Sequence, residues 1–278
     1  MDTSQFQSLK VSSEDDGRRI VVSLDHGRAN EMGSVEIGDW ERLAKALETD
    51  PARTLLTYSA RRTSKGTAVF IAGANVTERA EWTPDQVRAH VARQRAALAA
   101  VRRAPVFHVA VVDGVALGWG TEFLLTCDYR IAAPGAQFGL PETGLGIVPG
   151  AGGTAELWSV VGVNQALRLG MTGETLDAPE AMRIGLVEET CASLEAGLAR
   201  ARALTDKVAR RSPTAVAAFK RGVLDAVGAS ERAAIESAAY DLCVETGEAA
   251  RGRAAFKDIL AGGEAPWGPK KLGPKKLA

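Results

Sequence analysis

The sequence lacks an excess of either charge. Lysine plus arginine number 34 and aspartate plus glutamate number 34, so the formal net charge at pH 7 is zero. A chain without a basic excess has no general attraction for nucleic acid or for an acidic membrane surface. Residues 265–278 carry four lysines and no acid, which leaves the rest of the chain mildly acidic. We therefore expect neither a nucleic-acid nor a membrane partner.

Cysteine and histidine are also scarce. The three cysteines are an odd number without a C-x-x-C pair, which excludes a disulfide framework and a zinc ribbon. The three histidines stand far apart in unlike segments, which argues against a histidine metal site or a histidine-centred triad. We expect a reduced, cytoplasmic protein whose chemistry depends on carboxylates and backbone groups, without a metal.

Long apolar runs are missing as well. No uninterrupted stretch approaches the roughly 18 residues that a membrane span needs. The first residues have neither the basic start nor the apolar stretch of an export signal, so we expect neither export nor insertion.

Strand-like and helix-like segments alternate in the first half of the chain. Runs rich in β-branched residues predict strands, and apolar residues at helical spacing predict helices. The predicted strands are residues 19–24, 54–59, 69–71 and 106–112, and the predicted helices among them are residues 35–47 and 84–103. Later segments are predicted as helices over 194–207, 213–227, 231–244 and 248–260, with one short strand over 186–189. This order predicts an α/β core followed by a helical C-terminal region.

Three divisions of the chain follow from these patterns. Residues 1–205 are expected to form the core that holds the active site, and residues 206–264 a helical region. Residues 265–278 repeat the pattern GPKKL and bury nothing, so we expect a disordered lysine-rich tail.

Two glutamates stand in a glycine-rich, almost uncharged stretch between residues 114 and 153. Glu122 follows a glycine turn and precedes an apolar run, and Glu142 follows a proline. Two partly buried carboxylates in different surroundings can keep one protonated and the other ionised at neutral pH. The same pattern is compatible with a simpler interpretation, in which Glu122 favours a helix dipole and Glu142 caps a turn.

Two small-residue turns follow predicted strands, Ala72-Gly73-Ala74 and Gly118-Trp119-Gly120. Each turn can present free backbone N–H groups, and two such donors converging on one oxygen form an oxyanion hole. Losing one donor of such a site typically costs roughly a hundredfold to a thousandfold in rate. Plain connections between a strand and a helix are the alternative explanation.

Four segments in this order and spacing resemble the enoyl-CoA hydratase/isomerase (crotonase) family. They are FIAGAN, VDGVALGWGTEFLLTCDYRIA, AQFGLPETGLGIVPGAGGT and TGETLDAPEAMRIGLVEE. The resemblance extends from about residue 19 to residue 256. It implies a crotonase-like α/β spiral of ββα repeats with a C-terminal helical trimerisation region, and a homotrimer or homohexamer. It also implies an acyl-CoA thioester as the substrate, with no cofactor beyond the coenzyme A of that substrate.

The resemblance assigns roles to individual residues. The backbone N–H groups of Ala74 and Trp119 take the oxyanion-hole positions, and Glu122 and Glu142 the catalytic positions. The segments beside them are implied in substrate and CoA binding, namely Arg28, Ala29, Ala72, Gly73, Asn75 and Gly118. Because both glutamates are retained, the resemblance favours hydration of a 2-enoyl-CoA over the other activities of the family.

Several departures from the family pattern keep alternatives open. Trp119 stands where the family usually has glycine, and Asn75 replaces an aspartate. Residues 61–67 resemble an insertion near the CoA site, and the C-terminal segment lacks the usual Glu-Lys-Arg. An isomerase, a decarboxylase, a C–C hydrolase or a noncatalytic CoA-ester-binding subunit therefore remain alternatives.

Other chemistries are disfavoured by the sequence. The glycine-rich stretch contains no G-x-G-x-x-G, which argues against a nicotinamide cofactor. Aromatic residues are only 5% of the chain, which argues against a sugar site with two carboxylates. We predict Cys127 as a core residue within an apolar helix.

Overall fold

The strands alternate between two sheets. The computed structural model describes residues 1–211, 213–226, 237, 240–241, 243–263 and 265–266. Its six-stranded sheet has the order β1-β2-β3-β5-β7-β10, and its four-stranded sheet has the order β4-β6-β8-β9. The strands are β1 (Leu9–Glu14), β2 (Arg19–Leu24), β3 (Thr54–Ser59), β4 (Val69–Ile71), β5 (Phe107–Val112), β6 (Val115–Leu117), β7 (Tyr129–Ala132), β8 (Gln137–Gly139), β9 (Thr175–Asp177) and β10 (Glu189–Thr190).

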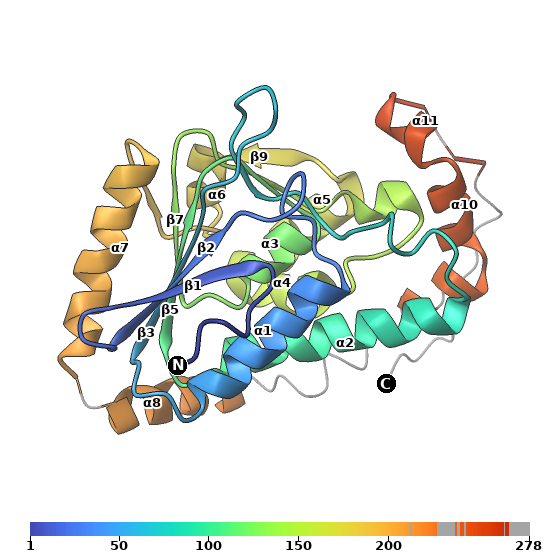
Figure 1. Ribbon diagram of the computed structural model, residues 1–278. Coiled ribbons are helices and arrows are strands. Elements are labelled where there is room, and N and C mark those ends of the chain that lie inside the picture. The colour runs from blue at the N-terminus through green and yellow to red at the C-terminus, as the bar shows by residue number, and fades with distance from the viewer. Residues whose placement is uncertain (212, 227–236, 238–239, 242, 264, 267–278) are drawn as a thin grey trace.

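Helices follow most of the strands (Figure 1). The α-helices are α1 (Ser34–Leu47), α2 (Pro84–Arg103), α3 (Trp119–Leu124), α4 (Gly153–Val161), α5 (Val163–Thr172), α6 (Ala178–Arg183), α7 (Leu194–Ala209), α8 (Pro213–Ala226), α10 (Glu248–Ala254) and α11 (Phe256–Leu260). A 3₁₀ helix, η1 (Pro141–Leu145), follows β8.

The connectivity is a spiral of repeats. The consecutive strand pairs β3–β4, β5–β6 and β7–β8 each place the first strand in the large sheet and the second in the small sheet. The three first strands pair in parallel with one another, and so do the three second strands. Helices α2 and α3 follow the first two pairs. This is the α/β spiral of ββα repeats that the resemblance implied.

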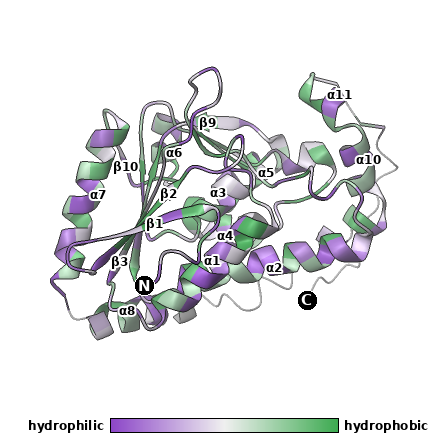
Figure 2. Cartoon of the chain, viewed as in Figure 1, coloured by the Kyte–Doolittle hydropathy of each residue, from purple (hydrophilic) through white to green (hydrophobic). Residues whose placement is uncertain are grey.

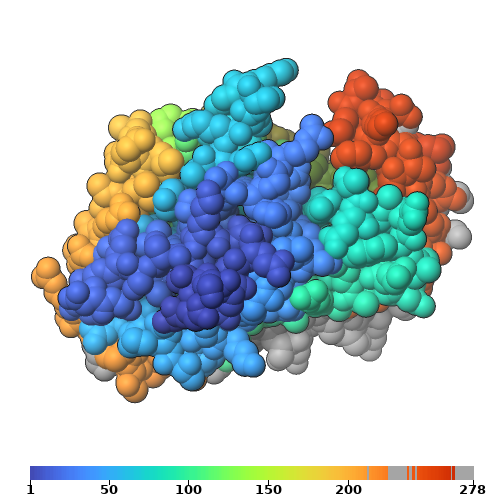
Figure 3. Space-filling view, viewed as in Figure 1, coloured from blue at the N-terminus to red at the C-terminus, as the bar shows by residue number. Residues whose placement is uncertain are grey.

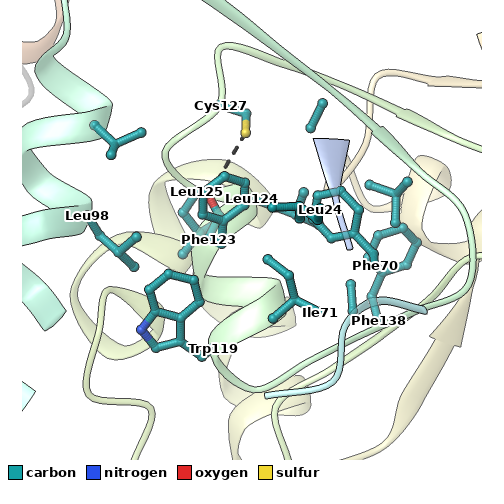
Figure 4. Packing of buried hydrophobic residues seen from close by; sticks show 14 of the residues in the cluster. Leu24, Phe70, Ile71, Leu98, Trp119, Phe123, Leu124, Leu125, Cys127 and Phe138 are labelled. Atoms are coloured by element: carbon teal, nitrogen blue, oxygen red, sulfur yellow. Dashed lines mark hydrogen bonds between the residues drawn. The ribbon is translucent and has the colours of Figure 1, made fainter. Parts of the chain in front are cut away.

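The large sheet is apolar on both faces, which explains the continuous valine-rich run in β5. Val109 and Val111 pack in a cluster with Ala201 of α7, whereas Ala110 and Val112 belong to the main core on the other face. Side chains of a strand alternate between the two faces of a sheet, so a strand covered on both sides needs apolar residues throughout. Figure 4 shows part of the main core around Phe123.

The predicted start of α2 is confirmed in detail. The Thr83 side chain accepts a hydrogen bond from the Gln86 N–H, the Gln86 side chain bonds back to the Thr83 N–H, and Pro84 occupies the first turn. This reciprocal arrangement satisfies two backbone donors that a helix N-terminus otherwise leaves free. In Figure 2, α2 and α7 carry both hydrophilic and hydrophobic residues along their length, as expected for helices packed on one side.

Four features differ from the sequence-based expectations. The predicted strand over 186–189 is wrong, because only Glu189–Thr190 pairs with β7 and residues 186–188 form a bend. The predicted helix over 248–260 is interrupted by a turn at Ala255, giving α10 and α11. Cys127 is buried as predicted, but it lies in the turn after α3 and outside any helix. The pattern also missed β1, a largely exposed edge strand with few apolar residues, and the short strands β6, β7, β8 and β9, which alternate too briefly to be distinguished from loops.

Other expectations lie wholly or partly outside the described residues. They concern most of the predicted helix over 231–244 and nearly all of the tail over 265–278. The division of the chain after residue 205 stays a prediction. Among the described helices, none is both long enough and apolar enough to cross a membrane.

Candidate active site

The two small-residue turns lie side by side at the ends of neighbouring parallel strands. Strand β4 leads into the turn with Ala74, and β6 leads into the turn with Trp119. The turns touch, since a Cβ added to Gly120 would lie 2.3 Å from the carbonyl oxygen of Ile71. Only glycine therefore permits this approach of the two backbones.

The N–H of Ala74 is left free by its local pairing. The N–H of Met32 donates to the carbonyl of Gly73 (2.9 Å), and the N–H of Asn75 donates to the carbonyl of Met32 (2.8 Å). These bonds use the peptide groups on both sides of Ala74, and its own N–H donates to no described acceptor. Gly73 reaches this geometry with a φ of +127°, which disfavours a side chain at that position.

The N–H of Trp119 is free for a different reason. Trp119 is the first residue of α3, where backbone donors have no acceptor within the helix. The positive φ of 53° belongs to Gly118, so the tryptophan itself fits the helix without strain. A residue with a Cβ at position 119 therefore keeps the backbone donor that the resemblance implied.

The indole of Trp119 belongs to the core. It is 2% exposed and stacks on Phe123 with a centroid distance of 5.9 Å, and it lies next to Leu98 in Figure 4. Its Nε1 is buried without a hydrogen-bond partner. Leu98, which belongs to the same core cluster as the indole, lines a cavity of about 100 Å³ that adjoins Glu122, whereas Trp119 itself does not line this cavity.

Glu122 is held by the N-terminus of another helix. It is the fourth residue of α3 and only 3% exposed. Its Oε1 accepts hydrogen bonds from the N–H groups of Ala151 (2.7 Å) and Gly153 (2.9 Å), where α4 begins. Backbone donors and the positive end of a helix stabilise a negative charge on this carboxylate. A Cβ on Gly153 would lie 3.2 Å from Oε1 and 2.5 Å from the Cβ of Pro149, which explains glycine there.

Glu142 has a contrasting environment. It lies in η1, and its Oε2 is buried without a hydrogen-bond partner. Burial raises the pKa of Glu142 from 4.5 to about 7, so that both protonation states are present near neutral pH. Its Oε1 lies against Gly118, at the start of the helix that carries Glu122. Thus two carboxylates in unlike surroundings flank the first turn of α3.

The segments expected to bind CoA meet at the same edge. The N–H of Ala72 donates to the carbonyl of Ala29 (3.1 Å), which places the turn after β2 beside the turn after β4. The N–H of Ala29 is bound by the side chain of Glu31 (2.9 Å), whereas the side chain of Arg28 is exposed. Asn75 uses its Oδ1 to accept the N–H of Glu78 (3.2 Å).

Residues 61–67 form a projecting loop next to this edge (Figure 3). The loop closes on itself through the N–H of Thr63, which donates to the carbonyl of Thr67 (2.8 Å). At its base, Arg61 donates to the carbonyl of Arg28 (3.2 Å) and contacts Asp25 (3.3 Å). The insertion therefore lies against the turn that carries Arg28.

Sequence reasoning missed two residues near the glutamates. A Cβ on Gly252 of α10 would lie 1.8 Å from the carbonyl oxygen of Leu145, so the C-terminal region packs directly on η1 and supports Glu142. Arg79 follows the Ala74 turn and is only 7% exposed. From the sequence alone, an arginine in a polar loop such as Arg79 is predicted to be exposed to solvent. Its burial depends on segments far away in sequence.

Cys127 and His108 are buried close together, with 3.7 Å between Sγ and Nε2. Burial raises the pKa of the Cys127 thiol to about 12 and lowers the pKa of His108 well below its usual value. A thiol in this state is a poor nucleophile, so the pair serves as core packing. Within the described part of the chain, no group of three or more His, Cys, Asp or Glu residues is placed to hold a metal ion.

Comparison with known proteins agrees with this geometry. The model of the family "Enoyl-CoA hydratase/isomerase" matches residues 62–261. The mouse protein "Enoyl-CoA hydratase domain-containing protein 2, mitochondrial" is 35% identical over 267 residues, covering 93% of this chain and 88% of its own length. The human "Methylglutaconyl-CoA hydratase, mitochondrial" is 31% identical over 259 residues, covering 90% of this chain and 75% of its own length. The crystal structure of an enoyl-CoA hydratase from Bacillus anthracis superposes with a TM-score of 0.74 at 31% identity, covering 91% of this chain and 97% of the other. The chain therefore belongs to the enoyl-CoA hydratase/isomerase, or crotonase, family.

Proposed function

We propose that this protein is an enoyl-CoA hydratase, which adds water across the C2–C3 double bond of a 2-enoyl-CoA thioester. One observation carries the proposal: two buried carboxylates with different environments flank the first turn of α3, beside two unused backbone N–H groups. Hydration needs a base for water, an acid for carbon and a site for the enolate oxygen.

The free N–H groups of Ala74 and Trp119 bind the thioester oxygen in this mechanism. When water attacks C3, the electrons of the double bond move toward the thioester and charge develops on that oxygen. Donors fixed in advance by the backbone stabilise this charge without reorganising during the reaction.

The two glutamates divide the proton transfers. Glu122, held by Ala151 and Gly153 N–H groups, takes a proton from the attacking water. Glu142, whose pKa is about 7, delivers a proton to C2 of the enolate. The product gains a hydroxyl group at C3 and one hydrogen at C2, and proton transfer from Glu122 to Glu142, directly or through solvent, restores both carboxyl groups.

The relatives support this activity within the family. The mouse and Bacillus anthracis proteins above are named as an enoyl-CoA hydratase domain-containing protein and an enoyl-CoA hydratase, and the human protein as a methylglutaconyl-CoA hydratase. An isomerase, a decarboxylase or a C–C hydrolase that forms the same enolate is the alternative, and so is a noncatalytic subunit that binds CoA esters. The reaction as proposed needs no cofactor besides the CoA of the substrate.

We place the CoA part of the substrate along the edge where the turns after β2 and β4 meet. Arg28 and Ala29 lie on one side of this edge, and the turn from Ala72 to Asn75 lies on the other. Gly118 completes the site, because it allows Glu142 to approach Trp119. A cytoplasmic location stays a prediction, since the mammalian relatives are named as mitochondrial.

We also propose that the late helices assemble the protein into a trimer or hexamer. Three large apolar side chains are exposed on these helices: Phe219 (76%), Val223 (48%) and Leu260 (71%). Phe219 and Val223 lie four residues apart on α8, whereas Leu260 lies on α11, far from α8 in Figure 1. Apolar groups exposed at this level favour burial against another subunit.

The proposed activity is tested with crotonyl-CoA, by following the loss of absorbance of the conjugated thioester. We expect enzyme-dependent loss of this absorbance and formation of 3-hydroxybutyryl-CoA. Binding of crotonyl-CoA without turnover, together with failure on longer and branched 2-enoyl-CoA thioesters, would contradict the proposal and favour the noncatalytic alternative.

A further inference from the structure

One edge of the Arg79 guanidinium is buried without a partner. Arg79 is 7% exposed, and its Nε and Nη2 atoms are both inaccessible to solvent and form no hydrogen bond. A buried cation with unsatisfied donors costs several kcal/mol unless a ligand or another group pairs with it. Such an arrangement in a folded protein needs an explanation.

The acids nearest to Arg79 are occupied by other groups. Glu78 uses its Oε2 to accept the N–H of Ser34 at the start of α1 (2.9 Å). Glu122 uses its Oε1 to accept two N–H groups at the start of α4. Neither acid forms a hydrogen bond with Nε or Nη2 of Arg79, so the two donors on this edge of the guanidinium are buried and unsatisfied.

The unpaired edge is the one that binds carboxylates elsewhere in this chain. Nε and Nη2 of Arg93 donate to the two carboxylate oxygens of Glu41 at 2.9 and 2.7 Å. Arg202 binds Glu14 through the same two atoms at 3.0 and 2.8 Å. Two parallel N–H groups match the two oxygens of a carboxylate, which gives both strength and orientation.

Arg79 also lies beside the proposed catalytic site. Burial lowers the pKa of Arg79, and the nearby Tyr240, Glu78 and Glu122 counter part of this effect. Tyr240 packs against Gly150, since a Cβ added to Gly150 would lie 2.8 Å from Cδ2 of Tyr240. Gly150 is followed by Ala151, whose N–H donates to the Glu122 carboxylate.

The neighbouring His90 adds no second positive charge beside Arg79. Burial and the positive charge of Arg79 lower the pKa of His90 to about 4, so the imidazole is neutral at pH 7. Its Nε2 is also buried without a partner. Arg79 is therefore the charged member of this pair at pH 7, and its unpaired buried charge is unfavourable beside a purely hydrocarbon acyl chain.

We propose that the Nε–Nη2 edge of Arg79 binds a carboxylate at the far end of the acyl group, so that the preferred substrate is a 2-enoyl-CoA that carries a second, free carboxylate. This inference rests on the proposed function, because it places the acyl chain beside Glu122. A carboxylate satisfies both buried donors, whereas a neutral chain leaves the charge unpaired and is discriminated against.

The test compares 2-enoyl-CoA thioesters in pairs of equal carbon number, one ending in a carboxylate and the other in a methyl group. We expect kcat/KM to favour the carboxylate by roughly a hundredfold or more at the best chain length. In Arg79→Met this preference ratio is expected to collapse to near unity or to reverse. Arg79→Lys should keep part of it, since the charge remains but the two-point geometry is lost.

Arg93→Met is the matched control. This variant removes an arginine on α2 whose Nε and Nη2 atoms donate to the carboxylate of Glu41 on the surface. This variant should keep the wild-type preference ratio. An Arg79→Met ratio equal to that of wild type, with the variant folded by circular dichroism, would overturn the proposal.

A binding measurement separates this inference from the hydratase mechanism. Glutaryl-CoA and valeryl-CoA are saturated and cannot be hydrated, so calorimetry reports recognition alone. Tighter binding of glutaryl-CoA by wild type, lost in Arg79→Met, supports carboxylate recognition even if no enoyl-CoA is hydrated. Equal affinity for the two thioesters, with hydration of neutral enoyl-CoA intact, contradicts carboxylate recognition and leaves the proposed function standing.

Discussion

The carboxylate of Glu142 lies where a side chain at Gly118 would be: a Cβ added to Gly118 would lie 2.6 Å from Oε1 of Glu142. Gly118 also takes a φ of 53° with a ψ of −119°, a backbone conformation that side chains rarely adopt. The glycine therefore allows two things at once, the turn that exposes the Trp119 N–H and the approach of the Glu142 carboxylate. Both contribute to the proposed mechanism.

Gly118→Ala is expected to displace the Glu142 carboxylate and to distort the donor at Trp119. We expect hydration to fall by roughly tenfold or more, with a loss of stability of about 1 to 3 kcal/mol from the strained backbone. Gly144→Ala is the matched control on η1, because a Cβ there meets nothing within 4 Å. Steady-state kinetics and thermal melts of both variants check this, and equal activity of the two would contradict it.

The pKa of Glu142 predicts how the rate depends on pH. The proton donor must be protonated, and its pKa is about 7, so the rate is expected to fall as the pH rises above about 7. A profile of kcat/KM that stays flat from about pH 6 to pH 9 would contradict this role.

The free energy of unfolding is also expected to depend on the protonation state of Glu142. The pKa of Glu142 in the folded protein is raised above its ordinary value of 4.5. The contribution of Glu142 to the stability of the fold is therefore fully present below about pH 4.5 and is lost as the pH rises through about 7. Glu142→Gln removes this dependence. The variant should therefore gain stability relative to wild type between pH 5 and pH 8, by up to about 3 kcal/mol. Denaturant melts at both pH values measure the difference.

Trp119→Gly keeps the backbone N–H and removes a buried indole. We expect hydration to persist and acyl preference to broaden, because the indole lies next to Leu98 of the cavity beside Glu122. The loss of core packing should lower stability by about 3 to 5 kcal/mol, so Trp119→Phe is a second variant that retains a ring against Phe123. An unchanged substrate profile would place the indole away from the acyl group. Complete loss of hydration in folded protein that still binds the ester would mean that the side chain itself takes part in catalysis.

Assembly is expected to depend on the late helices. Light scattering should give a trimer or a multiple of three, and Phe219→Asp should shift the protein toward smaller species. Met182→Asp is the control, since Met182 is also exposed (45%) but lies on α6. Removal of residues 267–278 should leave assembly intact. A wild-type protein that is monomeric or dimeric contradicts the proposed assembly.

Local patterns predicted much of the fold. The strands over 19–24 and 54–59 and the helix over 84–103 have the predicted bounds, because each has a clear period and a defined start or end. The three-residue strands β6 and β9 were not predicted, although β4, which is equally short, was. They are stabilised by pairing with distant strands, and their own residues show no period.

The candidate site also combines features that the local sequence predicts with features that depend on tertiary packing. The sequence placed Glu122 near a helix N-terminus, but the helix that binds its carboxylate is α4, about thirty residues later, and not its own helix. The free N–H of Ala74 depends on pairing with Met32, which no local pattern indicates. The buried state of Arg79 is likewise a property of packing. Motifs predicted the candidate residues of the site, whereas the groups that position them depend on the tertiary structure.

The most direct test of the account compares Glu122→Gln and Glu142→Gln with wild type in the hydration of crotonyl-CoA and in the binding of butyryl-CoA. The account predicts that each variant loses roughly a hundredfold or more in kcat, because each carboxyl group handles a different proton. Affinity for butyryl-CoA should stay within a few fold, since neither proton transfer is involved in binding. Near-wild-type turnover in either variant would contradict the two-glutamate mechanism, and loss confined to Glu142→Gln would move the assignment to an isomerase.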